Sequence, residues 1–560
     1  MKLTGAQFTI ATLEYYGIET IAGIPGGSNL PLYDALRSSS IRHILARHEQ
    51  GAGFIAQGMA RSTGRPAVCF ATSGPGATNL LTALADAKMD SVPVVAITGQ
   101  VPTSYLGTDA FQEVDICAMA APVTRFCIQV KEPEELYRAI PRAFEIAMGP
   151  RPGPVLIDIP KDVQKKVFEC DTFPPYPAPG KCICVHEEKL TAIANEINAA
   201  QRPFMYIGGG IINSGASDIL RRFAEKTNIP IASTLMGLGA IESDHPLFMG
   251  MLGMHGAQFV NRALAQSDLI LAFGVRFDDR AIGNHSDFCP EARIVHIDID
   301  DAQIDKICRS NIGLQADIGW ALERLIGLVG HGSLSNWHSQ IGHLRQTSYD
   351  HMDSVTNPDH PLSLIATVGA LAGKDTIVTT DVGQHQMWVA QAYPFKKPAT
   401  FLTSGGLGTM GFGLPAAIGA ALANPGREVI CFTGDGSLLM NIQELATLAE
   451  LDLNVKIVLL NNETLGLVKQ QQELFYDGRS FASSFDAGPD FTAIAANFGI
   501  KGFRLERQDE RLADLTEALV NPGPSLIEIA IGAQEMVFPM VPPGGANHSM
   551  ICKRKGIECL

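Results

Sequence analysis

The sequence lacks any long uninterrupted run of apolar residues. In its 560 residues, no hydrophobic stretch approaches the ~18 residues that a membrane span requires. Residues 1–7 enter an amphipathic pattern directly, so we expect no targeting segment and no membrane anchor. The sequence also lacks an excess of positive charge, because 43 lysines and arginines stand against 58 aspartates and glutamates, for a net charge of −15. A nucleic acid or an anionic membrane as the main partner is therefore disfavoured, and small molecules or other protein chains are expected instead.

The cysteines lack the spacing of a disulfide framework or of a zinc finger. There are eleven, an odd number, and most lie in apolar runs such as Val68-Cys69-Phe70, where a thiol acts as a small hydrophobic group. Only Cys182 and Cys184 lie close together, near His186, and no second ligand pair accompanies them. We expect reduced thiols, no metal at these cysteines, and a cytoplasmic protein.

The chain has the composition and length of a packed protein with several domains. Its 46% hydrophobic and 18% charged residues are typical of globular proteins, and 560 residues suffice for three or four domains. The proline-rich residues 173–180 and the polar residues 331–361 are interpreted as linkers. The segments between them, 1–172, 185–330 and 361–547, alternate short β-branched runs with helical patterns. This alternation predicts an α/β fold of three doubly wound parallel sheets.

A weak internal repeat relates the first segment to the third. Residues 68–72 form an apolar strand pattern that enters the turn Gly74-Pro75-Gly76, and a helical pattern and a second strand follow. About 360 residues later, residues 428–432 enter Gly434-Asp435-Gly436 in the same way. Both units read as βαβ with glycines at the carboxyl end of a strand, where open α/β sheets bind ligands. The two turns differ at their centre, since an aspartate can hold a cation and a proline cannot.

The most specific chemical signal is Gly434-Asp435-Gly436-Ser437 followed by Asn461-Asn462. The glycines let the backbone approach an anion, and a helix that begins there directs its N-terminal amides at phosphate. Asp435 and Asn462, at the ends of adjacent predicted strands, offer the oxygen ligands that Mg²⁺ prefers beside a diphosphate. Read separately, the first half could be a tight turn and the second a helix cap. Together at this spacing, they favour a magnesium diphosphate site.

This motif resembles the diphosphate anchor of thiamine-diphosphate-dependent enzymes. Further motifs resemble the catalytic large subunits of the acetohydroxyacid synthases, also called acetolactate synthases, and the similarity extends over residues 1–547. These motifs lie at residues 23–27, 47–52, 107–113, 276–280, 383–388, 404–411 and 539–544. The resemblance implies an N-terminal pyrimidine-binding domain (1–172), a central FAD-binding domain (185–330) and a C-terminal domain that binds diphosphate and Mg²⁺ (361–547).

The resemblance also implies a reaction and the residues that take part in it. Pyruvate is decarboxylated on thiamine diphosphate, and the two-carbon unit is joined to a second pyruvate or to 2-oxobutanoate, on the route to branched-chain amino acids. Glu49 matches the carboxyl that binds the pyrimidine ring of the cofactor, where burial would raise its pKa. Without the family, Glu49 reads as an ordinary helix-start glutamate. Met410 matches the apolar residue that bends the cofactor, although a methionine here could also fill the core.

The remaining implied site residues fall into four groups. On the substrate side are Phe111 and Gln112, and the metal ligands are Asp435, Asn462 and the backbone carbonyl of Thr464. The cofactor is expected to contact Gly383, Gln384, His385, Gly408, Gly434, Gly436, Ser437, Gly466 and Leu467. FAD, in a structural rather than redox role, is expected to contact Gly208, Gly209, Gly210, Arg276, Asp278, Arg280 and Asp298. Because Glu49 and Asp435 lie in different segments, the active site forms between domains; the family implies two subunits, as a homodimer or tetramer, and leaves open a small regulatory subunit.

Two positions depart from the common family pattern. Thr124-Arg125 stands where many members have Thr-Lys, and a planar guanidinium does not replace an ammonium group in a tight pocket. Gln471 stands where many members carry a tryptophan, which bears on the choice between acceptor substrates. Two alternatives remain: another thiamine-diphosphate and FAD enzyme of pyruvate, such as an oxidase or carboligase, and a catalytically silent regulatory homologue. The paired histidines of the related decarboxylases are absent, and the retention of Glu49, Asp435 and Asn462 disfavours a silent copy.

Overall fold

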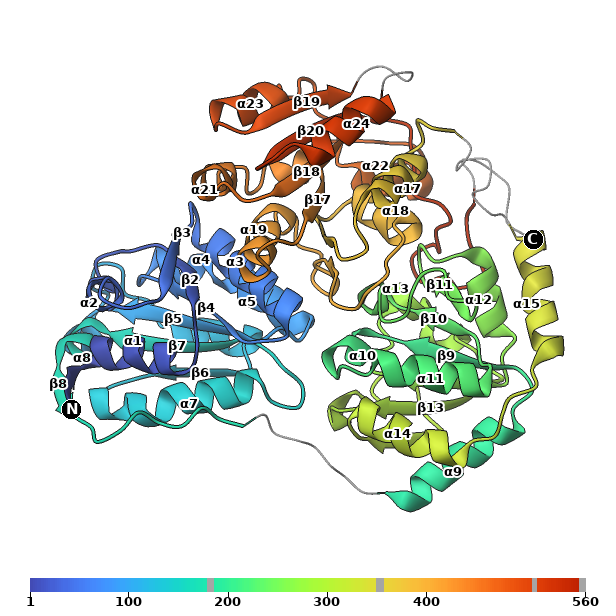
Figure 1. Cartoon of the computed structure of the whole chain (residues 1–560), viewed down its shortest axis with the longest axis horizontal. Coiled ribbons are helices and arrows are strands. Elements are labelled where there is room, and N and C mark those ends of the chain that lie inside the picture. Colours follow the sequence, from blue (N-terminus) through green and yellow to red (C-terminus); the bar gives the residue numbers. More distant parts are fainter. Residues whose placement is uncertain (179–185, 349–356, 506–510, 553–560) are drawn as a thin grey trace.

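The computed structural model describes residues 1–178, 186–348, 357–505 and 511–552. It contains three six-stranded sheets, and every strand pair within them is parallel. Figure 1 shows one sheet in the N-terminal part, one in the central part and one in the C-terminal part, each flanked by helices. The predicted α/β class with three parallel sheets is confirmed.

The N-terminal sheet has the strand order β3-β2-β4-β5-β7-β6, and a short antiparallel pair, β1 with β8, lies beside it. Its apolar strands are buried on both faces, as expected for a parallel sheet covered by helices. The strands are β1 (Lys2–Thr4), β2 (Thr20–Gly23), β3 (Arg42–Leu45), β4 (Ala67–Ala71), β5 (Val94–Gln100), β6 (Phe126–Gln129), β7 (Val155–Pro160) and β8 (Val167–Glu169). The helices are α1 (Gly5–Tyr15), α2 (Leu30–Leu36), α3 (Glu49–Thr63), α4 (Pro75–Asn79), α5 (Leu81–Met89), α6 (Ile116–Ala120), α7 (Leu136–Ala147) and α8 (Lys161–Lys165).

The central sheet has the order β11-β10-β9-β12-β13-β14. Its strands are β9 (Pro203–Ile207), β10 (Ile231–Ser233), β11 (Phe248–Met251), β12 (Leu269–Phe273), β13 (Arg293–Asp298) and β14 (Ile312–Gln315). The accompanying helices are α9 (Glu187–Ala199), α10 (Gly209–Asn213), α11 (Ser217–Thr227), α12 (Gln258–Ala265), α13 (Asp279–Ile282), α14 (Ile318–Leu328) and α15 (Ser335–Thr347).

The prediction of a linker over residues 331–361 is wrong for its middle part, because α15 lies there. Trp337, Ile341 and Leu344 are buried in the core of the central domain, and the Trp337 indole donates to the Pro203 carbonyl at 3.0 Å. These three side chains recur at a spacing of three and four residues, the apolar stripe of a helix, which the overall polarity of the stretch concealed. Figure 1 shows α15 along the outer side of the central domain.

The C-terminal sheet has the order β16-β15-β17-β18-β20-β19. Its strands are β15 (Ile377–Thr380), β16 (Phe401–Leu402), β17 (Val429–Gly434), β18 (Val455–Asn461), β19 (Lys501–Leu505) and β20 (Ser525–Ala530). Its helices are α17 (Pro361–Leu371), α18 (Gln384–Ala392), α19 (Gly413–Ala423), α20 (Asp435–Leu438), α21 (Glu444–Leu451), α22 (Gly466–Phe475), α23 (Phe491–Asn497) and α24 (Arg511–Val520).

Helices α3 and α19 join the N-terminal and C-terminal domains. A Cβ atom added at Gly58 would lie 2.0 Å from the Ala416 carbonyl oxygen, and one added at Gly419 would lie 1.9 Å from the Ile55 carbonyl oxygen. Only glycine permits backbones to approach this closely. The two helices are adjacent in the centre of Figure 1, so the first and third domains are held by direct backbone contact.

Seven described cysteines have free thiols: Cys69, Cys117, Cys127, Cys170, Cys289, Cys308 and Cys431. Cys552 takes part in a disulfide, which corrects the expectation that every cysteine is reduced. Nothing in the sequence pointed to this disulfide, because Cys552 lies near the chain end and outside the apolar strands. Cys182 and Cys184 lie outside the described residues. Over the described parts of the chain, no helix combines the length and apolar character needed to cross a bilayer.

Candidate active site

Asp435 lies at the carboxyl edge of the C-terminal sheet. It follows β17, begins α20, and is only 4% exposed. Its Oδ2 atom is buried and has no hydrogen-bond partner, and burial raises the pKa of this carboxyl to about 6. A buried carboxylate oxygen without a partner is costly unless a ligand completes it. The site therefore has the chemistry to hold a cation, and the role of Asp435 as a magnesium ligand stays a prediction.

Asn462 and Thr464 follow β18, which is paired in parallel with β17, so they reach the same edge as Asp435. The Asn462 amide donates to Gln384 Oε1 at 3.0 Å and its Oδ1 accepts from the Thr464 amide at 3.1 Å. The buried Thr464 hydroxyl has no hydrogen-bond partner. A carboxylate beside amide and carbonyl oxygens suits Mg²⁺. Within the described residues, no cluster of three or more His, Cys, Asp or Glu side chains offers an alternative metal site.

Several residues predicted to contact the cofactor pack tightly around this edge. A Cβ atom added at Gly434 would lie 2.9 Å from His385 Nδ1, and one at Gly466 would lie 2.0 Å from Gln384 Oε1. His385 is buried with an unpartnered Nε2 atom, and burial lowers the pKa of its ring to about 3, which keeps it neutral. Ser437 is buried on α20 beside Gly434, with its hydroxyl 3.5 Å from the Gly434 carbonyl oxygen. Gly383, Gly436 and Leu467 lie at the starts of α18, α20 and α22 respectively.

Gly408 and Met410 lie in an irregular segment between β16 and α19. Gly408 has a φ of +71°, which favours glycine, and Met410 is half-buried. The buried Asp381 carboxylate accepts from the Gly411 amide at 2.7 Å and from the Gly413 amide at 3.3 Å, and burial raises its pKa to about 6. Asp381 thus fixes the backbone just after Met410, a role the sequence did not reveal.

Glu49 lies at the carboxyl edge of the other outer sheet. It begins α3, its Oε2 accepts from the Asn79 amide at 2.9 Å, and its Oε1 lies 3.2 Å from a Cβ atom added at Gly76. In the single chain it is partly exposed rather than buried. The glycine turn that the repeat highlighted therefore lies beside Glu49, and Asn79 is a contact that the sequence did not suggest.

Gln112 and Phe111 lie next to the same turn. Gln112 has a φ of +59°, and its Cα lies 2.9 Å from a Cβ atom added at Gly74. Phe111 is 87% exposed, which is unusual for a large aromatic side chain. The structure thus brings Glu49, Phe111 and Gln112 to one edge. Asp435, Asn462 and His385 form the edge of a different sheet.

A cavity of about 410 Å³ lies where the three domains meet. Gly209, Gly210, Arg276 and Asp298 from the predicted flavin set line it, and Gly208 precedes them at the end of β9. Burial raises the pKa of Asp298 to about 6. Asp278 and Arg280 lie on α13 instead, where Asp278 caps the helix and Arg280 is exposed. The lining fits a nucleotide near the glycine-rich start of α10.

Arg151 also lines this cavity and was missed from the sequence. Its guanidinium donates to Asp300 at 2.7 Å and to Ser91 at 3.0 Å. The unusual Arg125 packs on Gly153. Burial, and to a lesser extent the like charge of Arg151, lower the pKa of Arg125. Gln471 is exposed on α22, whereas its neighbour Gln470 is buried and bonded to Gln384 and Val537.

Comparison with protein families assigns each domain. Residues 3–119 match the N-terminal TPP binding domain of thiamine pyrophosphate enzymes, residues 190–325 match their central domain, and residues 381–529 match their C-terminal TPP binding domain. These ranges contain Glu49, Arg276 and Asp435 respectively.

Individual relatives match over almost the whole chain. The chain is 53% identical to acetolactate synthase isozyme 1 large subunit of Escherichia coli, covering 98% of each chain. It is 44% identical to the probable acetolactate synthase large subunit of Methanocaldococcus jannaschii, over 98% of this chain and 95% of the relative. It is 43% identical to acetolactate synthase 1, chloroplastic, of Nicotiana tabacum, over 99% of this chain and 85% of the relative.

Proposed function

The chain belongs to the acetolactate synthase large subunits, a family of thiamine pyrophosphate enzymes, and from this premise we propose how its residues carry out the reaction. The protein is an acetolactate synthase, which transfers a two-carbon unit from pyruvate to a second 2-oxo acid in branched-chain amino-acid biosynthesis. Thiamine diphosphate, when bound, supplies the carbanion that adds to pyruvate and accepts the electron pair left by decarboxylation. Mg²⁺ and FAD are the further cofactors typical of this family.

Asp435, Asn462 and the Thr464 carbonyl hold Mg²⁺ and, through it, the cofactor's diphosphate. The observation that carries this proposal is the buried Asp435 Oδ2 atom without a partner, at an edge shared with Asn462. A cation there compensates the buried charge. Gly434 and Gly466, where a Cβ atom would clash with a neighbouring side chain, let the backbone approach the diphosphate. His385, neutral and buried, adds a ring nitrogen for a hydrogen bond.

Glu49 protonates and deprotonates the cofactor's pyrimidine ring, and Asn79 orients its carboxyl group. The Asn79 amide at 2.9 Å leaves Oε1 free to face the ring. Met410 would supply an apolar contact to the rings of the bound cofactor. Gln112 and Phe111 lie on the same edge as Glu49 and contact the substrate.

The active unit is a dimer in which Glu49 of one subunit faces Asp435 of its partner. Glu49 and Asp435 lie on edges of different sheets, and Phe111, 87% exposed in the single chain, gains cover from a second copy. A tetramer made of two such dimers is the alternative assembly. The relatives are named large subunits, so a small regulatory subunit is a further partner. The biosynthetic role of those relatives favours the cytoplasm.

The test is an assay of the purified protein with pyruvate, thiamine diphosphate, Mg²⁺ and FAD. We expect acetolactate and CO₂ in equal amounts, with no net change in the flavin absorbance, because the reaction transfers no electrons. Formation of acetate with flavin reduction would instead indicate an oxidase. No product from a protein that binds all three cofactors would indicate a silent homologue.

A further inference from the structure

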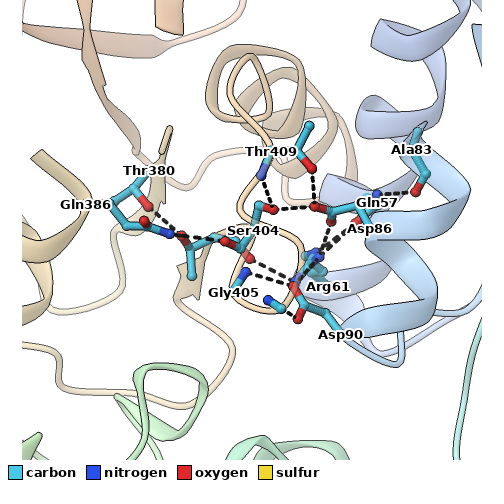
Figure 2. Close-up of polar contacts among 12 residues, drawn as sticks. Gln57, Arg61, Ala83, Asp86, Asp90, Thr380, Gln386, Ser404, Gly405 and Thr409 are labelled. Atoms are coloured by element: carbon cyan, nitrogen blue, oxygen red, sulfur yellow. Dashed lines mark hydrogen bonds and ion pairs between the residues drawn. The ribbon is translucent and has the colours of Figure 1, made fainter. Parts of the chain in front are cut away.

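A buried ionic cluster joins the N-terminal domain to the segment that carries Met410. Arg61 on α3 contacts two carboxylates of α5 and the residue after it, Asp86 at 2.8 Å and Asp90 at 2.9 Å. Both carboxylate side chains are completely buried and the Arg61 side chain is 6% exposed. Gln57 accepts from Arg61 at 2.8 Å, and the Phe412 ring lies against the guanidinium. Figure 2 shows Gln57, Arg61, Asp86 and Asp90 converging between the two domains.

Both carboxylates bind the segment of residues 404–409 directly. Asp90 accepts from the Gly405 amide at 2.9 Å and from the Gly406 amide at 2.8 Å. Asp86 accepts from the Ser404 hydroxyl and, at 3.0 Å, from the Thr409 hydroxyl. The Ser404 hydroxyl in turn accepts from the Thr409 amide at 2.8 Å. Figure 2 shows the segment wrapped around the two acids, which hold it between β16 and α19.

The cluster contains two carboxyl groups and one guanidinium, so one negative charge is in excess while both acids are ionised. Burial raises the pKa of Asp86, whereas Arg61 and the hydroxyls of Ser404 and Thr409 act in the opposite direction. The four donors of residues 404–409 are the neutral groups that solvate this charge. A buried charge is stable only when its hydrogen bonds are satisfied. The segment has no regular secondary structure of its own, so its conformation and the charge of the cluster depend on each other.

The same cluster forms part of the wall of the cavity of about 410 Å³, which residues of the predicted flavin set also line. Arg61, Met89 and Asp90 line the cavity together with Met236 and Arg276. On the far side, a Cβ atom added at Gly406 would lie 3.2 Å from Arg276 Nη2, and one at Gly405 would lie 2.2 Å from Met236 Sδ. Gly405 and Gly406 are therefore in close contact with the cavity wall on one side and with Asp90 on the other.

We propose that Arg61, Asp86 and Asp90 are positioning residues that transmit flavin occupancy to the thiamine site through residues 404–409. A flavin in the cavity packs against Arg276 and Met236, fixes the glycines that donate to Asp90, and thereby sets Gly408 and Met410. The flavin then serves catalysis by shaping the neighbouring site, without electron transfer. This inference rests on the proposed function, with FAD bound in the cavity and Met410 in contact with thiamine diphosphate.

The experiment compares the dissociation constant of thiamine diphosphate, with Mg²⁺ present, for flavin-free and flavin-loaded protein by calorimetry. In the native protein we expect the flavin to tighten binding by about 5-fold or more, within the usual range of coupling between sites. In Asp90→Asn, one amide oxygen replaces two carboxylate acceptors, so we expect this ratio to fall to about 1. We also expect a lower kcat with little change in the KM for pyruvate, because the substrate's own contacts remain.

Two further variants make the test decisive. Thr409→Val removes one hydroxyl donor while keeping the shape of the side chain, so we expect a smaller fall in the ratio of dissociation constants. This variant should fold even if Asp90→Asn does not. Asp244→Asn changes an exposed acid paired with Lys396, and we expect it to keep the native ratio. A native ratio of 1, or an unchanged ratio in both cluster variants, overturns the proposal. Failure of the proposed function has a different result: the native protein would form no acetolactate, whatever the ratio of dissociation constants.

Discussion

The first and third sheets of this protein have the same architecture and different chemistry. Matching β2 to β15, β3 to β16 and the later strands in turn, the order β3-β2-β4-β5-β7-β6 becomes β16-β15-β17-β18-β20-β19. Each sheet has a glycine turn after the strand that comes third along the chain, β4 or β17. The turn contains Pro75 in one sheet and Asp435 in the other. One sheet edge presents the carboxyl of Glu49, to which we assign proton transfer, and the other presents the carboxyl of Asp435, to which we assign cation binding. The comparison teaches that a fold repeated within one chain acquires separate roles through a few side chains at one edge.

The helices that lie between the two sheets are related by the same internal repeat. Gly58 approaches Ala416, and Gly419 approaches Ile55. Gly419 lies 361 residues after Gly58, and Ala416 lies 361 residues after Ile55, so each contact repeats the other with the two helices exchanged. The packing of α3 on α19 is therefore nearly symmetric, as in an isologous interface. The symmetry ends at the edges, where ligands bind.

The largest expected effect comes from removing the acid of the first edge. Glu49→Gln keeps the shape and the contact with Asn79 but cannot transfer a proton, so we expect turnover to fall by about 10²–10⁴-fold with the protein still folded and able to bind thiamine diphosphate. Turnover at saturating cofactor measures this. The exposed Glu19→Gln, in the same domain, serves as the control. Native turnover in Glu49→Gln would remove the role assigned to Glu49.

Removal of the acid of the third sheet's edge should act on binding instead. Asp435→Ala deletes one of two side-chain magnesium ligands, and we expect the affinity for thiamine diphosphate with Mg²⁺ to fall by at least about 100-fold, more than loss of an outer partner costs. FAD should remain bound to the central domain. Separate titrations of the two cofactors check this, and loss of both together would contradict the separation of their sites.

Gln471 bears on the choice of acceptor. Pyruvate and 2-oxobutanoate differ by one methylene, and an apolar wall discriminates such a pair by about 10–200-fold. A glutamine provides little of such a wall, so we expect the native enzyme to show little preference for 2-oxobutanoate. Gln471→Trp should raise the ratio of acetohydroxybutyrate to acetolactate from mixed substrates. A strong preference for 2-oxobutanoate in the native enzyme would mean that another residue supplies the wall.

The smallest expected effect tests the symmetric helix contact. Gly58→Ala places a methyl group against the Ala416 backbone, so we expect a loss of about 1–3 kcal/mol in stability. Gly327→Ala is the control, because a Cβ atom at that position in α14 meets nothing within 4 Å. We expect this control to stabilise by about 0.5–1 kcal/mol. Thermal unfolding of both variants measures the difference, and equal behaviour would show that the contact between α3 and α19 tolerates a side chain.

The sequence predicted more of this site than of its surroundings. The three parallel sheets, the repeat, and the neighbouring positions of Asp435 and Asn462 follow from strand patterns and glycine turns, because these signals are local. The roles of Asp381, Asn79 and Arg151 were missed, since each contacts residues distant in the chain and none lies in a motif. The same reason hid the cluster of Arg61, Asp86 and Asp90. Helix α15 was mistaken for a linker because its composition is polar overall and only three apolar residues form its buried stripe.

The most direct test of the account mixes two inactive proteins. If Glu49 of one subunit faces Asp435 of the other, a dimer of one Glu49→Gln chain and one Asp435→Ala chain contains one native site and one doubly altered site. Random pairing makes half of the dimers mixed, so the account predicts recovery of about a quarter of native activity after the two proteins are unfolded together and refolded. Each variant refolded alone should stay inactive. No recovery in the mixture, with mixed dimers demonstrated by mass, would contradict the account and would place both acids of each site in one chain.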